Sequence, residues 1–451
     1  MEKRVDAVVL GAGITGLTTS FLLQEQGKSV VLLEQADRVG GPMQTLEVNG
    51  FVFESGPNTG VVGNRSVLDL FERLAPDCLL ETAKSEAKRR LIWKGDRFEA
   101  LPAGLMDAIR TPLFTWKDRF RVLAEPFRRK GSNPNESVAD LTRRRLGQSF
   151  LDYAVDPFVS GIYAGDPHRL LTRYALPKLY RLEQEYGSFV RGSFKRAPQI
   201  REEKRQGVSK EVFSVKDGSG RSGFGCLVAC LKQRLHHEVL RLSVSSMQIT
   251  PVDGRWLVEL PQTGERLLAD RVISTVPAYA LPDVFPFISK DLLDPIASLL
   301  YAPVVQVGVG LKDDRRIPQA FGGLVPSCEG RPLLGILFPS ACFSNRAGVV
   351  SFFMGGVRHP EMLSWTDAAL TEVVVDALHT MLGYEPGFVP DAVHIFRHAR
   401  AIPQYEMGSA ERLAAVDRIE AKYPGIVIGG GLRDGIGLAD RIAQAYVFAG
   451  F

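Results

Sequence analysis

Three glycines near the N-terminus have a spacing that suits them to contact a phosphate. Gly11, Gly13 and Gly16 form the pattern Gly-x-Gly-x-x-Gly, in which the first glycine permits a tight turn and the second lets a pyrophosphate approach the backbone. An acidic residue, Glu34, lies eighteen residues after Gly16. A carboxylate at this distance accepts hydrogen bonds from a ribose hydroxyl, so these residues predict a dinucleotide-binding site.

The elements that would position this site flank the glycines. Residues 5–10 are an apolar, β-branched run typical of a buried parallel strand, and residues 17–26 resume helical spacing. Residues 29–33 form a second apolar run that ends at Glu34. A glycine motif alone is weak evidence, because glycine-rich turns are common, but strand, turn, helix, strand and acid in this order predict a Rossmann-like domain.

A second glycine segment follows Glu34 directly. The pattern Glu-x-x-x-Arg-x-Gly-Gly, ending at Gly41, resembles the flavoprotein superfamily that includes amine oxidases, phytoene desaturases and protoporphyrinogen oxidases, and the resemblance implies FAD. Arg38 would supply a cation near the diphosphate. The cofactor-binding residues that the resemblance implies in this part are Gly11, Gly13, Ile14, Thr15, Gly16, Glu34, Arg38, Gly40, Gly41, Gly56, Pro57 and Asn58.

The C-terminal part has a matching piece. Residues 425–428 are strand-like, residues 429–431 are glycines, and an amphipathic run continues to Phe448. This strand, loop and helix would return to the first domain and place backbone N–H groups against the flavin, whereas the alternative is an unrelated terminal strand and helix. The remaining FAD contacts expected are Val244, Gly431, Ile436, Gly437 and Leu438. The FAD would be noncovalent.

The middle of the chain resembles one branch of the superfamily. Residues 156–167 read Asp-Pro-Phe-Val-Ser-Gly-Ile-Tyr-Ala-Gly-Asp-Pro and resemble the signature of the protoporphyrinogen oxidases in their plant and bacterial forms. Residues 322–338 and 401–408 agree with the same family, while residues 213–222 depart from its Lys-Gly-Gly pattern. The resemblance implies oxidation of protoporphyrinogen IX by successive hydride transfers to FAD, with oxygen or another acceptor taking the electrons.

The same resemblance implies a set of substrate-binding residues. Arg90 matches an arginine that binds a propionate in the family, which suits the bidentate fork of a guanidinium, although the adjacent Arg89 is an alternative. A methylene between two pyrroles is already a good hydride donor, so we expect no residue to act as acid or base, and no metal. The positions implied are Arg90, Leu324, Leu337, Phe353, Gly161 and Gly165, for which core packing or a tight turn is the alternative role.

Composition excludes several classes of protein. The chain has 451 residues, of which 45% are apolar, and a net charge of +4, which is typical of two or three globular domains. Five cysteines without a Cys-x-x-Cys motif indicate neither a disulfide framework nor a zinc site. Since no uninterrupted apolar run reaches about 18 residues, we expect no membrane span.

One segment is basic. Residues 84–146 hold sixteen Lys and Arg, Arg143 to Arg145 among them, against eight Asp and Glu. Between residues 102 and 147 cations alternate with aromatic and aliphatic side chains at helical spacing, which predicts peripheral attachment to a membrane surface. The alternative is a solvated helical subdomain, and no motif indicates nucleic-acid binding. The side chains concerned include Leu113, Phe114, Trp116, Phe120, Phe127, Arg110, Lys117, Arg119, Arg121, Arg128, Arg129 and Lys130.

These observations predict an α/β protein with α+β parts. We expect a discontinuous FAD-binding domain, a mixed-sheet substrate domain and a helical membrane-facing insertion, located in the cytoplasm on the inner membrane, with a homodimer and a haem-pathway enzyme as possible partners. A coproporphyrinogen oxidase, a flavin amine oxidase and a tetrapyrrole or flavin carrier are the alternatives. The expected domain segments are 1–80, 215–275 and 395–451 for FAD, 81–92 and 276–394 for substrate, and 93–214 for the helical insertion.

Overall fold

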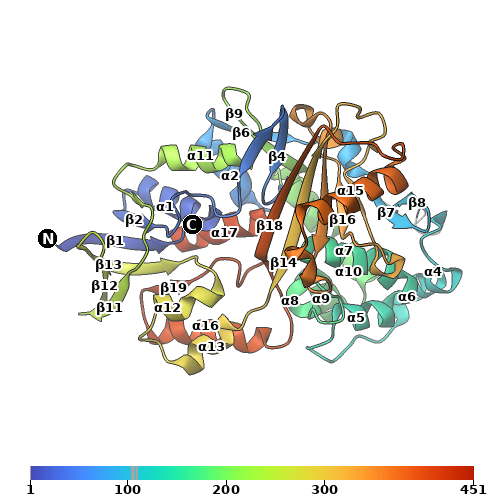
Figure 1. The fold of residues 1–451 in the computed structure, drawn as a ribbon. Coiled ribbons are helices and arrows are strands. Elements are labelled where there is room, and N and C mark those ends of the chain that lie inside the picture. The colour runs from blue at the N-terminus through green and yellow to red at the C-terminus, as the bar shows by residue number, and fades with distance from the viewer. Residues whose placement is uncertain (1, 103–106, 108–109) are drawn as a thin grey trace.

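Two seven-stranded sheets organise the chain, and distant stretches contribute to each (Figure 1). The computed structural model describes residues 2–102, 107 and 110–451. In the first sheet the strand order is β10-β2-β1-β13-β12-β11, and β19 pairs with β13. These strands are β1 Glu2–Leu10, β2 Val30–Leu33, β10 Leu240–Arg241, β11 Gln248–Val252, β12 Arg255–Leu260, β13 Glu265–Ser274 and β19 Ile426–Ile428.

The first sheet is parallel where it meets the glycine loop. Strand β1 pairs in parallel with β2 and β13, and β13 pairs in parallel with β19. The apolar run of β1 is buried on both faces because helices cover both sides of the sheet. Helices α1 (Ile14–Glu25) and α17 (Leu438–Ala449) lie side by side on one face (Figure 1), while α13 (Lys290–Ala297) and α16 (Ser409–Lys422) pack on the other.

The second sheet has the strand order β18-β14-β17-β16-β15-β7-β8 and is mostly antiparallel. One of its faces packs against α15 (Asp367–Leu382) and forms a hydrophobic core with it. The opposite face is therefore available for other elements. The strands are β7 Arg90–Lys94, β8 Arg97–Ala100, β14 Tyr301–Gly310, β15 Gly322–Leu324, β16 Gly335–Leu337, β17 Val349–Gly355 and β18 Ala392–Pro403.

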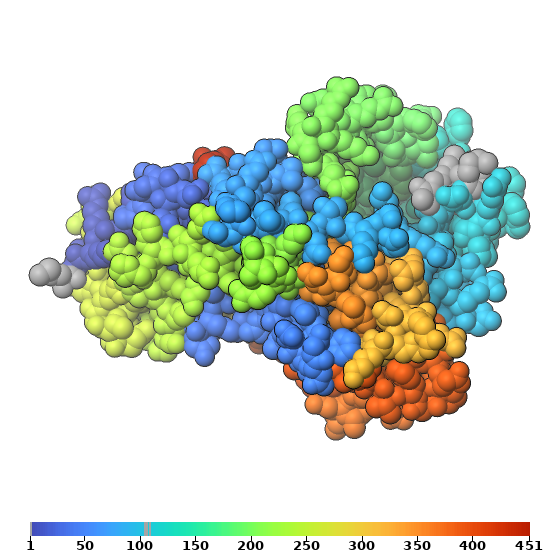
Figure 2. All heavy atoms as spheres, turned by 90° about the horizontal axis from the view of Figure 1, so that it is seen from above, coloured from blue at the N-terminus to red at the C-terminus, as the bar shows by residue number. Residues whose placement is uncertain are grey.

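The helical part occupies the end of the molecule away from β1, as Figure 2 shows in cyan and green. Two small sheets complete the fold: β3 (Thr45–Val48) with β4 (Phe51–Glu54), and β9 (Val212–Asp217) between β5 (Gly60–Val61) and β6 (Cys78–Thr82). Within the described residues no helix has the length and apolar character needed to cross a membrane. The helices are α2 Arg65–Leu74 and α11 Phe224–Arg234 beside the first sheet, and α4 Trp116–Leu123, η2 Glu125–Phe127, α5 Val138–Arg145, α6 Gln148–Phe150, η3 Leu151–Val155, α7 Asp156–Tyr163, α8 Thr172–Ala175, α9 Pro177–Tyr186 and α10 Phe189–Arg205 in the helical part.

The sheets divide the chain differently from the expected segments. Strand β18 pairs with β14 along its length, so residues 395–403 belong to the second sheet rather than to the FAD-binding part. Strand β8 likewise pairs with β7, although the helical insertion was expected to begin at residue 93. Helix α13 packs on the first sheet although residues 276–394 were expected in the substrate domain. Long-range pairing decides these boundaries, and a local pattern does not reveal it.

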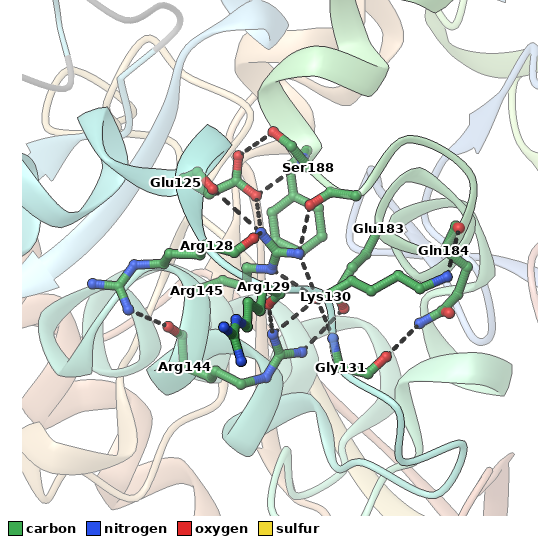
Figure 3. Close-up of polar contacts among 12 residues, drawn as sticks. Glu125, Arg128, Arg129, Lys130, Gly131, Arg144, Arg145, Glu183, Gln184 and Ser188 are labelled. Atoms are coloured by element: carbon green, nitrogen blue, oxygen red, sulfur yellow. Dashed lines mark hydrogen bonds and ion pairs between the residues drawn. The ribbon is translucent and has the colours of Figure 1, made fainter.

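Part of the basic segment is buried inside the helical part, so its cations do not all lie at the surface. The guanidinium of Arg145 is fully buried and lies 2.8 Å from Glu125 and 2.6 Å from Glu183 (Figure 3). Arg144 also contacts Glu183, at 2.8 Å. Ser188 donates a hydrogen bond to Glu125 at the start of α10. The network joins η2, α5, α9 and α10, because each buried charge is stable only with a partner.

Candidate functional site

The glycine loop lies at the carboxyl end of β1, where α1 begins. Gly11 has φ +92°, a conformation that favours glycine. A Cβ at Gly16 would clash with the carbonyl oxygen of Gly11, so only glycine lets α1 pack this close to the loop. At Gly13, by contrast, a Cβ would meet nothing within 4 Å. This open space beside the N-terminus of α1 fits a pyrophosphate, as the sequence predicts.

Glu34 follows β2 and reaches the same loop. Its Oε2 accepts a hydrogen bond from the Ala12 N–H at 2.6 Å, and its Oε1 accepts one from the Ala36 N–H at 2.9 Å. The N–H of Val244 donates to the Glu34 carbonyl oxygen at 2.9 Å. The carboxylate is half-buried. It therefore stands next to the glycine loop, where it can accept hydrogen bonds from a ribose.

Several of the other expected cofactor residues lie near this loop or near α17. The Gly40 N–H donates to the Ala12 carbonyl oxygen at 2.8 Å, and a Cβ at Gly41 would lie 3.8 Å from the Cα of Gly13. Ile436 packs against α7, and Gly437 is the N-cap of α17. The Thr15 hydroxyl donates a hydrogen bond to the Arg441 carbonyl oxygen of α17 at 3.4 Å. Ile14, Thr15, Gly431 and Leu438 lie on or beside α1 and α17, and the exposed Arg38 precedes the second glycine pair. This arrangement of glycines and polar groups thus fits a dinucleotide cofactor, while each contact between a residue and the cofactor stays a prediction.

Replacing Glu34 with alanine is expected to weaken FAD binding about ten- to hundredfold. Each charge-assisted hydrogen bond contributes about 1.5–3 kcal/mol, and the carboxylate also holds the glycine loop through Ala12. Titration of the apoprotein with FAD measures the loss. The matched control is Glu47→Ala, because Glu47 is an exposed carboxylate on β3. Equal FAD affinity in the Glu34 variant and the control would contradict the assignment.

Four of the six expected substrate residues lie on one face of the second sheet. Residues directly opposite one another on paired strands point to the same face, and so do residues two apart on a strand. One row across the sheet is Arg90, Gly322, Leu337 and Ser351, and the next is Ile92, Leu324, Gly335, Phe353 and Gln306. This face is opposite the one that packs on α15. The register therefore brings Arg90, Leu324, Leu337 and Phe353 together, and places Arg90, not Arg89, in the row.

The helical part borders this face and also contacts the loop before α17. Ile92 and Leu324 form a cluster with Leu113 and Phe114, and a Cβ at Gly161 of α7 would clash with the Leu324 side chain. Helix α7 also packs against Ile436, next to the cofactor loop. Gly165 differs from Gly161, because it is buried and its Cβ would meet Gln404 instead of Leu324.

Sequence reasoning missed the link between the two halves of the site. Asn58, from the expected cofactor segment, accepts hydrogen bonds from Ser351 at 3.0 Å and from Gln306 at 3.4 Å. Gln306 also donates to the Glu54 carbonyl oxygen at 2.7 Å. Both Gln306 and Ser351 are buried on the substrate face. A glutamine within the apolar run of β14 was the one signal that could have indicated this contact.

Glu54 forms a second link between the halves. Its buried carboxylate lies 2.7 Å from Arg346 and accepts hydrogen bonds from the Thr45 hydroxyl at 2.9 Å and the Phe224 N–H at 3.2 Å. Burial raises the pKa of Glu54 to about 7, although Arg346 opposes the shift. The Glu54 carboxyl therefore titrates near neutral pH.

The stability of the protein is expected to fall as pH rises from about 4.5 to about 7 because of Glu54. Between these pH values Glu54 keeps a proton in the folded state that it releases in the unfolded chain. The contribution of Glu54 to the free energy of unfolding is therefore fully present below the unfolded pKa and is lost above the folded pKa. At 1.36 kcal/mol per pH unit the loss is about 3 kcal/mol. Denaturant unfolding at several pH values should show a flatter profile for Glu54→Gln than for wild type. An identical slope in both proteins would refute this role of Glu54, and Glu47→Gln serves as the exposed control.

Comparison with known proteins places the chain in a family. The sequence pattern of the family described as flavin containing amine oxidoreductase matches residues 14–436. A protoporphyrinogen oxidase of Bos taurus is 30% identical, over 96% of this chain and 95% of that protein. The chloroplastic protoporphyrinogen oxidase of Nicotiana tabacum is 29% identical, over 99% of this chain and 85% of that protein.

Solved structures share the fold. A candidate protoporphyrinogen oxidase from a species of Exiguobacterium superposes with a TM-score of 0.78 at 22% identity, covering 100% of this chain and 98% of that one. Reduced UDP-galactopyranose mutase superposes with a TM-score of 0.69 at 17% identity, covering 98% and 94%. The expected fold class is thus confirmed. The chain belongs to the flavin-containing amine oxidoreductase family, in the branch of the protoporphyrinogen oxidases.

Proposed function

We propose that the protein is an FAD-dependent protoporphyrinogen oxidase, which converts protoporphyrinogen IX to protoporphyrin IX. The observation that carries this function is the substrate face, where one arginine and three apolar side chains lie in adjacent rows. The cofactor segment is joined to the same face through Asn58. Such a surface suits a large apolar ring with carboxylates on its edge.

The residues of the face have separate tasks in this reaction. Leu324, Leu337 and Phe353 are half-buried and provide an apolar surface that can hold the macrocycle and exclude water. Arg90 is exposed at the end of its row and can bind a propionate in a bidentate manner. When bound, FAD supplies the acceptor for the hydride that leaves the methylene. The protein therefore needs to orient the substrate and does not need a strong base.

The charges in the two rows of the substrate face favour protoporphyrinogen over coproporphyrinogen, which has more propionates. In the two rows described above, Arg90 is the one cationic residue. Measuring kcat/KM with both porphyrinogens tests the choice, and we expect the higher value for protoporphyrinogen IX. A higher value for coproporphyrinogen III would make the protein a coproporphyrinogen oxidase of the same family. Acid precipitation should release the flavin, since we propose that it is noncovalent.

We further propose that the helical part attaches the protein to the cytoplasmic side of the inner membrane. Four aromatic side chains there are largely exposed: Trp116 and Phe120 at 67%, Phe127 at 83% and Phe194 at 77%. Exposed aromatic residues next to cations suit a membrane interface. Leu113 and Phe114, expected at this surface, are instead buried against Ile92. Residues 103–106 and 108–109, where the helical pattern was expected to begin, lie outside the described residues.

Replacing Phe120 and Phe127 with serine is expected to lower binding to anionic phospholipid vesicles at least tenfold. Burial of one such side chain contributes about 1.5–3 kcal/mol. Co-sedimentation measures the loss, and turnover of detergent-dispersed substrate should change less. Val389→Ser is the control, because Val389 is 79% exposed but lies outside the helical part. Wild-type protein that stays in the supernatant would instead favour a solvated helical subdomain.

A further inference from the structure

A cavity of about 540 Å³ lies beside α4 and is lined by charged residues from several elements. This volume is within the range of about 300–1,000 Å³ that is typical of ligand pockets. Its wall includes the cationic residues Lys94, Lys117, Arg121 and Arg143 and the acidic residues Asp118 and Asp152. These residues come from β7, α4, α5 and η3, so the fold gathers them from separate parts of the chain.

The acidic residues of the cavity already have partners. Oδ2 of Asp118 accepts hydrogen bonds from both the N–H and the hydroxyl of Ser149, each at 2.8 Å, and the residue is buried. Asp152 accepts a hydrogen bond from the Gln148 amide at 2.7 Å. These interactions fix both carboxylates in the wall of the cavity.

Three of the four cations have no anionic partner in the part of the chain that the structure describes, whereas Arg143 forms an ion pair with Asp140 at 3.5 Å. Among the described residues Lys94, Lys117 and Arg121 form no ion pair. Lys94 donates to the backbone carbonyl oxygens of Pro112 and Leu113, and Arg121 reaches only the Arg144 carbonyl oxygen, at 3.5 Å. The Nε of Arg121 is buried and has no hydrogen-bond partner in the described part of the chain. Like charges that line one cavity repel one another, and a bound anion would offset this repulsion.

Helix α4 connects this cavity to the exposed aromatic surface. Lys117 and Arg121 are four residues apart and share one side of the helix, and Trp116 and Phe120 occupy the neighbouring positions. The cavity and the exposed aromatic side chains therefore share one helix, so an anionic group and an apolar chain of one molecule could bind beside each other there. A phosphate suits these cations, because arginine binds it with two parallel hydrogen bonds and lysine with a point charge.

We propose that this cavity binds the phosphate of an anionic phospholipid, with the acyl chains against Trp116 and Phe120. The assignment rests on the proposed membrane attachment and adds a specific headgroup site to it. A diffuse basic surface would attract anionic lipid without such a site.

The test compares two double variants that remove the same charge. Lys117→Gln with Arg121→Gln changes the cavity, and Arg129→Gln with Lys130→Gln changes cations outside its lining. Binding to phosphatidylcholine vesicles with and without phosphatidylglycerol is measured by co-sedimentation at low and at high salt. At high salt screening removes long-range attraction, so the control should match wild type while the cavity variant still binds phosphatidylglycerol vesicles about tenfold more weakly. Flavin content verifies that each variant is folded.

Three other results of these measurements would each overturn a different part of the proposal. Equal losses in the two double variants would overturn the cavity site and leave a diffuse attraction. Calorimetric binding of inorganic phosphate that the cavity variant loses, together with unchanged vesicle binding, would overturn the lipid assignment in favour of a soluble phosphate compound. Wild-type protein that binds neither vesicle would overturn the membrane attachment together with this site.

Discussion

Replacing Arg90 with alanine is expected to lower kcat/KM for protoporphyrinogen about ten- to thousandfold, with FAD content unchanged. Loss of one partner of a desolvated charge pair costs about 2–5 kcal/mol. Arg90 is in the same row as Leu337, at the edge of the substrate face. Since a carboxylate anchor also orients the substrate, kcat should fall as well as affinity. Steady-state kinetics with detergent-dispersed substrate measures both parameters.

Two further variants make this prediction specific. Arg90→Lys should recover only part of the loss, because an ammonium keeps the charge but loses the bidentate geometry. Arg89→Ala is the neighbouring control, since Arg89 precedes β7 and its carbonyl oxygen accepts from the Phe321 N–H at 2.8 Å. A fall of kcat/KM in Arg89→Ala instead of Arg90→Ala would identify Arg89 as the residue that binds the propionate. Unchanged kcat/KM in both alanine variants would mean that the propionate binds elsewhere.

Replacing Arg145 with methionine is expected to lower the free energy of unfolding by about 3–5 kcal/mol, because removing one member of a buried ion network leaves the others without a partner. Glu125 and Glu183 would both lose their contact with Arg145. Burial raises the pKa of Glu183, but hydrogen bonds from Arg144, Gly131 and Arg145 outweigh it and hold the pKa below its usual value. The carboxylate is therefore charged at neutral pH.

Denaturant unfolding of the Arg145 variant measures this cost. Arg143→Met is the matched control on the same helix, because the Arg143 side chain is 41% exposed and its ion pair with Asp140 is 3.5 Å long. An exposed pair contributes only about 0–1 kcal/mol. If both variants lose equally little stability, the network does not hold the helical part together.

The local parts of the site could be predicted from the sequence. The glycine loop, the two flanking strands, the first helix and the terminal strand and helix lie within a few residues of their expected positions. Each depends on a contiguous pattern, in which a glycine is required by a positive φ or by close packing, as at Gly11 and Gly16. Pattern and structure agree because neighbours in the sequence set these conformations.

The parts that depend on distant contacts could not be predicted. A run of three arginines usually indicates a solvated face, but Arg145 is fully buried because Glu183, far along the chain, neutralises it. Likewise Asn58 was expected to contact the cofactor, and its contacts with Gln306 and Ser351 of the second sheet were not expected. Such contacts follow from strand order and register, which a single sequence does not specify.

We expect this protein to oxidise protoporphyrinogen IX with its bound flavin. The most direct measurement is to mix the FAD-loaded protein with protoporphyrinogen IX without oxygen and to follow flavin absorbance together with porphyrin fluorescence. We expect the absorbance of the oxidised flavin to disappear as porphyrin fluorescence rises, more slowly in Arg90→Ala. Flavin that stays oxidised in the presence of bound protoporphyrinogen would contradict the proposed oxidase activity and favour a tetrapyrrole carrier.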